Sequence, residues 1–194
     1  MSGWWLASYV LLWLLVVTSL LVLLVVLRQL GLVYLNTRGG LRLDIGQSVG
    51  TPIEFSAVDI DGRMVRFPSG SAAHNLLLFT SPECTLCHGA LAALPAALAH
   101  RDLSAFVVDA GEPGESSAVR ERTTKDVPVI PSLALQQKLG IDSMPYGIVT
   151  DTKGVIVGKS VVSHLDDMED LLDRAVGADR SRHVEELTRI GGSR

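Results

Sequence analysis

The chain has 194 residues, 47% of them hydrophobic, and a formal net charge of −4 at pH 7. It carries no basic stripe of the kind that neutralises nucleic-acid phosphates, so we expect no nucleic acid among its partners. Its length allows one soluble domain with a hydrophobic core in addition to an apolar N-terminal segment.

The first predicted element is a membrane-spanning helix over residues 4–27, preceded by a short flank at 1–3. The segment carries no charge and is apolar apart from Ser8, Thr18 and Ser19. At about 1.5 Å per residue it is long enough to cross a hydrocarbon core of about 30 Å. The run is too long for the apolar core of a signal peptide, and no small-x-small cleavage site follows. We therefore expect an uncleaved anchor in a lipid bilayer.

The orientation of this anchor is predicted differently by charge and by chemistry. Arg28, Arg38 and Arg42 follow the span and no Lys or Arg precedes it, which by the positive-inside rule favours a cytosolic domain. A tethered dithiol, however, is most useful where disulfides form and exchange, and long domains translocate largely regardless of charge. We expect a single-pass protein of the inner (cytoplasmic) membrane with a periplasmic domain, against the charge count.

Glycines such as Gly39, Gly40 and Gly50 mark residues 28–51 as a linker. One α/β domain is predicted at 52–178, and a polar tail at 179–194. In chain order, the elements expected in the domain are strands 54–58 and 64–67 joined by a tight turn, strand 75–80, helix 89–100, strand 105–109, a helix within 115–125, an extended piece at 127–130, helix 133–140, strands 146–150 and 155–159, and amphipathic helix 166–176. The apolar strands 75–80 and 105–109 should be buried and parallel.

Cys84 and Cys87, the two cysteines of the chain, lie between a predicted strand and a predicted helix and are separated by Thr85 and Leu86. A helix N-terminus stabilises negative charge, so Cys84 should ionise more readily than a free thiol. Its thiolate would be the nucleophile of disulfide exchange, with Cys87 resolving the mixed disulfide. The sequence thus predicts a protein thiol-disulfide oxidoreductase whose redox group is the disulfide itself, with no other cofactor.

The cysteine pair has three alternative interpretations. Structural zinc needs four ligands and the chain has no second cysteine pair, so we expect no metal. His88 completes the Cys-x-x-Cys-His signature of c-type haem, which leaves open a non-enzymatic module that carries haem or copper. The strand that leads directly into the pair argues against haem. Two buried structural cysteines are the third alternative.

Two acidic residues are further candidates. Glu83 adjoins Cys84, where its charge would oppose the helix dipole, and it is also a weaker candidate for a proton shuttle. Asp109 ends a predicted buried strand, and we interpret it as a residue that enters a turn rather than as a buried acid beneath the dithiol.

The order of elements, with the dithiol after the first central strand, resembles the thioredoxin fold: a central mixed sheet flanked by helices. The resemblance implies that Pro145 is the cis-proline that faces the dithiol. The backbone of the preceding residue, Met144, would then be free to pair with a bound substrate chain.

A closer resemblance is to the methylamine utilisation protein MauD family. It rests on Leu27-Arg-Gln-Leu-Gly31 at the end of the anchor, Leu76–Pro82 before the dithiol, Met144-Pro-Tyr146, and Val161–Leu165. The family implies disulfide formation or isomerisation in a periplasmic client, the methylamine dehydrogenase small subunit, and a membrane redox partner that recycles the dithiol.

The chain departs from the family pattern at two places. Thr85-Leu86 stands where the family has Pro-Val, and the proline of the following helix is delayed from position 92 to Pro95. The dipeptide between the cysteines tunes redox poise in such proteins. The direction of exchange therefore stays open, with a reductant of apocytochrome c thiols as the rival function.

Overall fold

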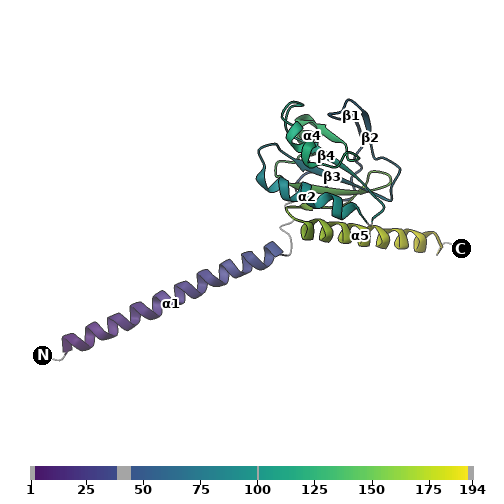
Figure 1. The fold of residues 1–194 in the computed structure, drawn as a ribbon. Helices are drawn as coiled ribbons and strands as arrows, with labels where there is room; N and C mark the ends of the chain where they lie inside the picture. The colour runs from purple at the N-terminus through teal and green to yellow at the C-terminus, as the bar shows by residue number, and fades with distance from the viewer. Residues whose placement is uncertain (1–2, 39–44, 100, 192–194) are drawn as a thin grey trace. The chain divides into compact units, whose positions relative to one another are not determined.

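The computed structural model of the chain describes residues 3–38, 45–99 and 101–191 (Figure 1). It divides into two compact units, Met1–Leu41 and Arg42–Arg194, which are described separately. Part of the predicted linker, including Arg42, lies outside the described residues. So do the last residue of the predicted helix 89–100 and the end of the tail.

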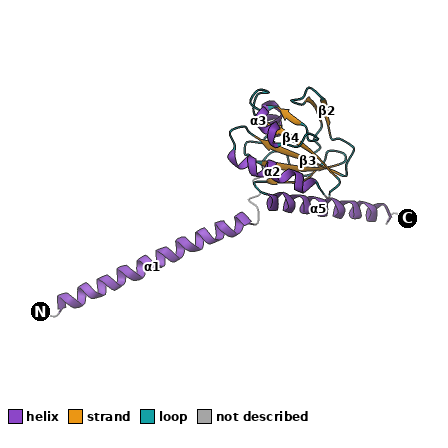
Figure 2. Cartoon of the chain, in the orientation of Figure 1, coloured by secondary structure: helices purple, strands orange, loops and turns teal. Residues whose placement is uncertain are grey.

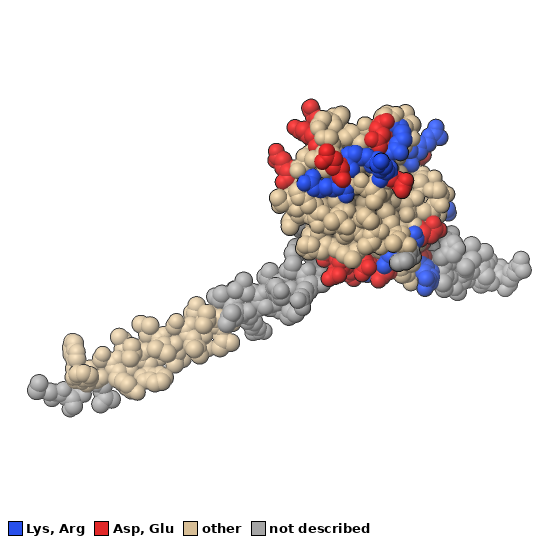
Figure 3. Space-filling model, in the orientation of Figure 1, with Lys and Arg blue, Asp and Glu red and all other residues tan. Residues whose placement is uncertain are grey.

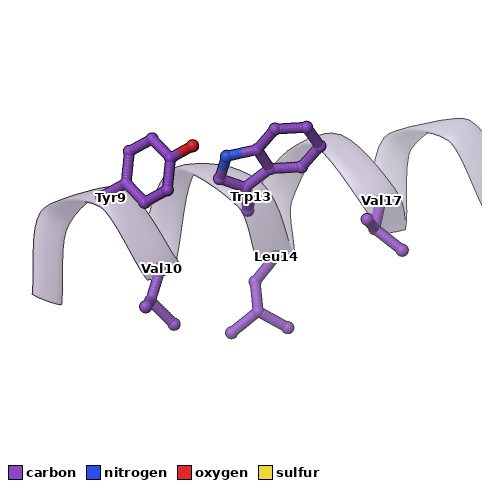
Figure 4. Close-up of a pocket in the computed structure, with 5 residues that line it drawn as sticks. All are labelled: Tyr9, Val10, Trp13, Leu14 and Val17. Atoms are coloured by element: carbon purple, nitrogen blue, oxygen red, sulfur yellow. The ribbon is translucent and has the colours of Figure 1, made fainter. Parts of the chain in front are cut away.

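The first unit is the helix α1 (Gly3–Arg38). Its residues Gly3–Val25 form a 23-residue segment that is long and apolar enough to cross a membrane. The helix continues beyond residue 27, so the first part of the predicted linker is helical. A shallow hollow on the surface of α1 is lined by Tyr9, Val10, Trp13, Leu14 and Val17 (Figure 4). Such an apolar surface suits contact with lipid acyl chains.

A five-stranded mixed sheet forms the centre of the second unit, in the order β5-β4-β3-β6-β7. Its strands are β3 (His74–Thr80), β4 (Leu103–Asp109), β5 (Val129–Pro131), β6 (Tyr146–Asp151) and β7 (Ile156–Val161). Strands β3, β4 and β5 are parallel, whereas β6 runs antiparallel to both β3 and β7. The predicted parallel pairing of the two apolar strands is confirmed, with Leu77 opposite Phe106.

Two apolar layers cover the sheet, because successive residues of β3 point to opposite faces. Leu76 and Leu78 pack with residues of α2 (Thr85–Leu98) and α5 (Leu165–Gly191). Leu77 and Phe79 pack against α4 (Leu133–Leu139) and the hairpin formed by β1 (Phe55–Val58) and β2 (Met64–Phe67). Figure 2 shows α2 and α5 on one side of the sheet, and α4, labelled in Figure 1, lies on the other. The predicted thioredoxin-like fold is confirmed.

Both edge strands of the sheet have backbone partners. Ile60, in the turn of the β1–β2 hairpin, donates its N–H to the carbonyl of Val129 on β5 over 2.8 Å. At the other edge, the N–H of Gly50 donates to the carbonyl of Ile156 on β7 over 2.9 Å. The N–H of Ile156 in turn donates to the carbonyl of Thr51 over 3.0 Å.

Two helices differ in length from the prediction. Helix α2 begins at Thr85 rather than at residue 89, because Cys84 serves as its N-cap. Helix α5 extends to Gly191 rather than ending at residue 176, so much of the predicted tail is helical. Gly177 lies within α5 and does not adopt the positive φ of a glycine that ends a helix. The residues after it are polar and include good helix formers. The polar segment 115–125 contains only a short helix, α3 (Ser117–Arg122).

Basic side chains of the domain lie among acidic ones (Figure 3). Arg63 pairs with Asp59 and Asp61 at 2.8 and 2.9 Å. Arg120, which precedes β5, also reaches Asp61, at 2.9 Å. These pairs tie the turn of the β1–β2 hairpin to the segment before β5.

Candidate active site at the start of helix α2

The cysteine pair lies where β3 leads into α2. After β3 ends at Thr80, a turn is closed by the N–H of Cys84, which donates to the carbonyl of Ser81 over 3.1 Å. Cys84 has extended backbone angles (φ −83°, ψ 101°), as an N-cap residue requires. Cys84 and Cys87 form a disulfide with a Cα–Cα distance of 5.3 Å, within the usual range for such a bond.

The sulfur of Cys84 takes the place of an N-cap oxygen. The backbone N–H of Cys87 donates to the Sγ of Cys84 over 3.1 Å. The first N–H groups of a helix have no partner within the helix, and they carry its positive dipole end. After reduction, a thiolate on Cys84 would be stabilised by this N–H and by the dipole, which favours Cys84 as the nucleophile.

The two sulfur-bearing residues differ in exposure. Cys84 is half-buried, whereas Cys87 is 1% exposed. A thiol from another protein can therefore approach Cys84 but is blocked from Cys87. Thr85 is exposed, and Leu86 is 56% exposed, which is unusual for a leucine in a packed domain. An approaching chain would meet the side chains of this dipeptide beside Cys84.

Pro145 and Met144 lie at the same end of the sheet as the cysteine pair. In the β3–β6 register Phe79 is opposite Tyr146, so the adjoining residues Thr80 and Pro145 both lie at this end. The Met144–Pro145 peptide bond is cis. Pro145 is buried and its carbonyl accepts the N–H of Val162 over 3.2 Å. A role for Met144 and Pro145 in binding a substrate chain stays a prediction.

Glu83 and His88 are both exposed. Glu83 immediately precedes the N-cap of α2, where the helix dipole favours a carboxylate. His88 lies in the first turn of α2. Within residues 3–38, 45–99 and 101–191, no group of three His, Cys, Asp or Glu side chains is arranged to hold a metal ion.

A buried polar cluster that the sequence did not reveal lies behind the turn that precedes α2. Asp109, Thr80 and Ser116 are all fully buried. The Asp109 carboxylate accepts hydrogen bonds from the hydroxyls of Thr80 and Ser116 over 2.9 and 2.7 Å. It also accepts the N–H of Gly111 over 3.2 Å, so Asp109 does enter a turn, but as a buried residue.

Gln136 completes this cluster from α4. Its side-chain N–H₂ donates to the carbonyls of Thr80 and Val108 over 3.0 and 3.2 Å. One signal was available in the sequence, since Thr80 and Asp109 end two apolar strands that were expected to be parallel. Nothing local to Ser116 or Gln136 marks them as buried.

Comparison with known proteins finds relatives of one name that match most of the chain. A "Methylamine utilization protein MauD" from Methylorubrum extorquens is 29% identical over 173 residues, which cover 86% of this chain and 84% of that protein. A protein of the same name from Paracoccus denitrificans is 26% identical over 179 residues, covering 89% and 90%. The chain is similar to MauD over most of its length. The resemblance found in the sequence is thus confirmed, although no family model matches the chain.

Solved structures support the fold. A putative protein disulfide isomerase from Bacteroides thetaiotaomicron matches with a TM-score of 0.59 at 16% identity, covering 73% of this chain and 98% of that one. A putative thiol:disulfide interchange protein DsbE from Chlorobium tepidum matches with a TM-score of 0.57 at 15% identity, covering 68% and 97%. The fold, the disulfide at the start of α2 and the similarity to MauD together indicate a thioredoxin-like thiol-disulfide oxidoreductase. Its N-terminal apolar helix is a candidate membrane anchor.

Proposed function

We propose that this membrane-anchored protein forms or isomerises disulfides in a periplasmic client protein. The observation that supports the proposal most directly is the unequal exposure of Cys84 and Cys87 at the N-terminus of α2. This asymmetry fits an exchange reaction in which one sulfur meets the client and the other resolves the intermediate.

In the direction of disulfide formation, a client thiolate attacks the Sγ of Cys84 and the Cys84–Cys87 bond breaks. Cys87 leaves as a thiolate and takes up a proton. A second client thiolate then attacks the client sulfur of the mixed disulfide and displaces the Cys84 thiolate. The client loses two electrons, which the cysteine pair gains. The two protons of the client thiols pass to solvent, and Cys87 takes up one proton from it. A membrane redox partner that accepts two electrons would restore the disulfide.

In isomerisation the reduced Cys84 thiolate attacks a client disulfide instead, and no net electron transfer takes place. Its N-cap position suits this role, because the Cys87 N–H favours the thiolate. The exposed side chains of Thr85 and Leu86 and the adjacent Met144–Pro145 segment would contact the client chain.

The methylamine dehydrogenase small subunit is the client that the MauD resemblance suggests. The relatives are named for methylamine utilisation, and MauD proteins are implicated in maturation of that disulfide-rich subunit. The identity of the client and the periplasmic orientation of the domain are both part of this proposal.

The first test is the reduction potential of the Cys84–Cys87 pair in the full chain in detergent, obtained by equilibration with glutathione and alkylation of free thiols. A value between about −120 and −200 mV, the range of oxidants and isomerases, supports the proposal. A value near or below about −270 mV would instead favour a reductant, such as one acting on apocytochrome c thiols.

The second test identifies the client. Full-length Cys87→Ala should accumulate a mixed disulfide with its client, since the resolving thiol is missing. Methylamine dehydrogenase small subunit in the trapped complex supports the proposed client. Apocytochrome c in its place would contradict it. Cys84→Ala serves as the matched control and should trap nothing.

A further inference from the structure

We infer that the turn at the end of β4, Asp109–Gly111, positions the Cys84 sulfur and thereby sets how readily its thiolate forms. The inference rests on the proposed function, because it concerns the same cysteine pair. Neither Asp109 nor Gly111 is placed in contact with the sulfurs, so both are positioning residues that act through Thr80 and Pro82.

The contact between Gly111 and Pro82 is the first observation. A Cβ atom added to Gly111 would lie 2.5 Å from Cγ and 3.2 Å from Cδ of Pro82. It would also lie 2.9 Å from the Oδ2 of Asp109. The backbone of Gly111 does not need a positive φ, so close packing rather than backbone conformation requires glycine here. The Pro82 ring therefore packs directly against Gly111.

The second observation is the bonding of the Asp109 carboxylate. One oxygen accepts the Thr80 hydroxyl, and the other accepts the Ser116 hydroxyl and the Gly111 N–H. The N–H of Ala110, between Asp109 and Gly111, donates to the carbonyl of Thr80 over 3.0 Å. The turn thus holds Thr80 through both its side chain and its backbone.

These contacts fix both sides of Ser81, whose carbonyl accepts the Cys84 N–H. Thr80 is held by Asp109 and Pro82 is held by Gly111, and Cys84 follows two residues after Pro82. A displacement of Pro82 would be passed through this short turn to Cys84. It would disturb the 3.1 Å contact between the Cys84 Sγ and the Cys87 N–H.

If the contact between the Cys87 N–H and the Cys84 Sγ is weakened, the Cys84 thiolate is stabilised less. The thiolate should then form at a higher pH, and the reduced pair should become less stable relative to the disulfide. In equilibrium with glutathione, the oxidised fraction should rise, because stabilisation of the reduced form is what makes such a pair oxidising.

The test compares Gly111→Ala with Gly114→Ala in the full-length protein in detergent. Gly114 lies in the same loop, but a Cβ there would meet nothing within 4 Å. Gly111→Ala should raise the midpoint of the thiolate absorbance titration and shift the glutathione equilibrium at least about threefold toward the disulfide. Gly114→Ala should match the wild type in both measurements. The inference fails if Gly111→Ala also matches the wild type, or if both variants shift alike.

Pro82→Ala keeps the test decisive if Gly111→Ala does not fold, because it removes the same contact by shortening a half-buried side chain. It should raise the titration midpoint as well. Adding Gly111→Ala to Pro82→Ala should produce less than half the shift seen in the wild-type background, since the ring that would collide is gone. An equal shift of the titration midpoint in both backgrounds would show that Gly111 does not act on Cys84 through Pro82.

Failure of the proposed function would look different. The thiolate titration starts from chemically reduced protein and needs no client or exchange activity. If the wild-type pair does not equilibrate with glutathione, the proposed function fails, while the titration still decides whether the turn positions Cys84.

Discussion

The backbone N–H of Cys87 donates to the sulfur of Cys84, so the resolving residue helps to stabilise the attacking one. The bond is local to the first turn of α2, and it depends on Cys84 being the N-cap. The order of the two cysteines in the chain therefore determines their roles.

Serine substitutions should separate these roles. Cys84→Ser should lose all exchange with a disulfide-containing peptide, whereas Cys87→Ser should still attack and should accumulate the mixed disulfide. Acid-quenched samples on non-reducing gels would show the adduct. An adduct formed by Cys84→Ser but not by Cys87→Ser would reverse the assignment.

The topology can be determined with the two native cysteines, since the chain has no others. In intact cells treated with a membrane-impermeant reductant, a membrane-impermeant maleimide should label Cys84 if the domain is periplasmic. Lysed cells provide the control for full labelling. Labelling that appears only after lysis would place the domain in the cytosol, as the arginines after the anchor suggest.

Removal of the Asp109 carboxylate should destabilise the domain. Asp109→Ala leaves the buried Thr80 and Ser116 hydroxyls and the half-buried Gly111 N–H without the carboxylate that accepts them, and we expect a loss of about 2–4 kcal/mol in the free energy of unfolding. Urea denaturation followed by circular dichroism would measure it. Asp142→Ala, at an exposed position, should change the free energy of unfolding by less than about 0.5 kcal/mol. Equal losses in the two variants would argue against the buried cluster.

Two glycines should respond in opposite directions to alanine. A Cβ at Gly147 on β6 would lie 2.8 Å from Cδ2 of Leu171 and 2.9 Å from Cγ2 of Val162, so Gly147→Ala should cost about 1–3 kcal/mol. A Cβ at Gly177 in α5 would meet nothing within 4 Å. Gly177→Ala should therefore gain about 0.5–1 kcal/mol through helix propensity. Thermal unfolding of both variants checks the signs, and a destabilised Gly177→Ala would contradict the continuous helix.

Much of the fold could be predicted from local patterns. Uniform apolar runs marked β3 and β4. The predicted amphipathic helix 166–176 lies within α5, where Met168, Leu171, Leu172 and Ala175 are buried. The length of α5 was not predicted, because residues 179–191 are mostly polar and only Val184, Leu187 and Ile190 among them are apolar.

Residue patterns alone predicted the candidate site only where its residues are neighbours in the chain, and Met144 and Pro145 were predicted from the family resemblance. Cys84 and Cys87 were found from their spacing. The contacts of Asp109 with Ser116, and of Gly111 with Pro82, join segments whose approach depends on how the strands pack. Single-sequence patterns do not contain that information.

The covered edges of the sheet limit how a client can bind. With Val129 on β5 and Ile156 on β7 already paired to other segments of the domain, a client strand cannot extend the sheet at these positions. An unfolded client is therefore directed toward the end of the sheet that carries Cys84, Leu86 and Met144. It would be held there by the covalent bond and by backbone pairing at Met144 rather than by a strand added along a sheet edge, and release would follow once the sulfur exchange is complete.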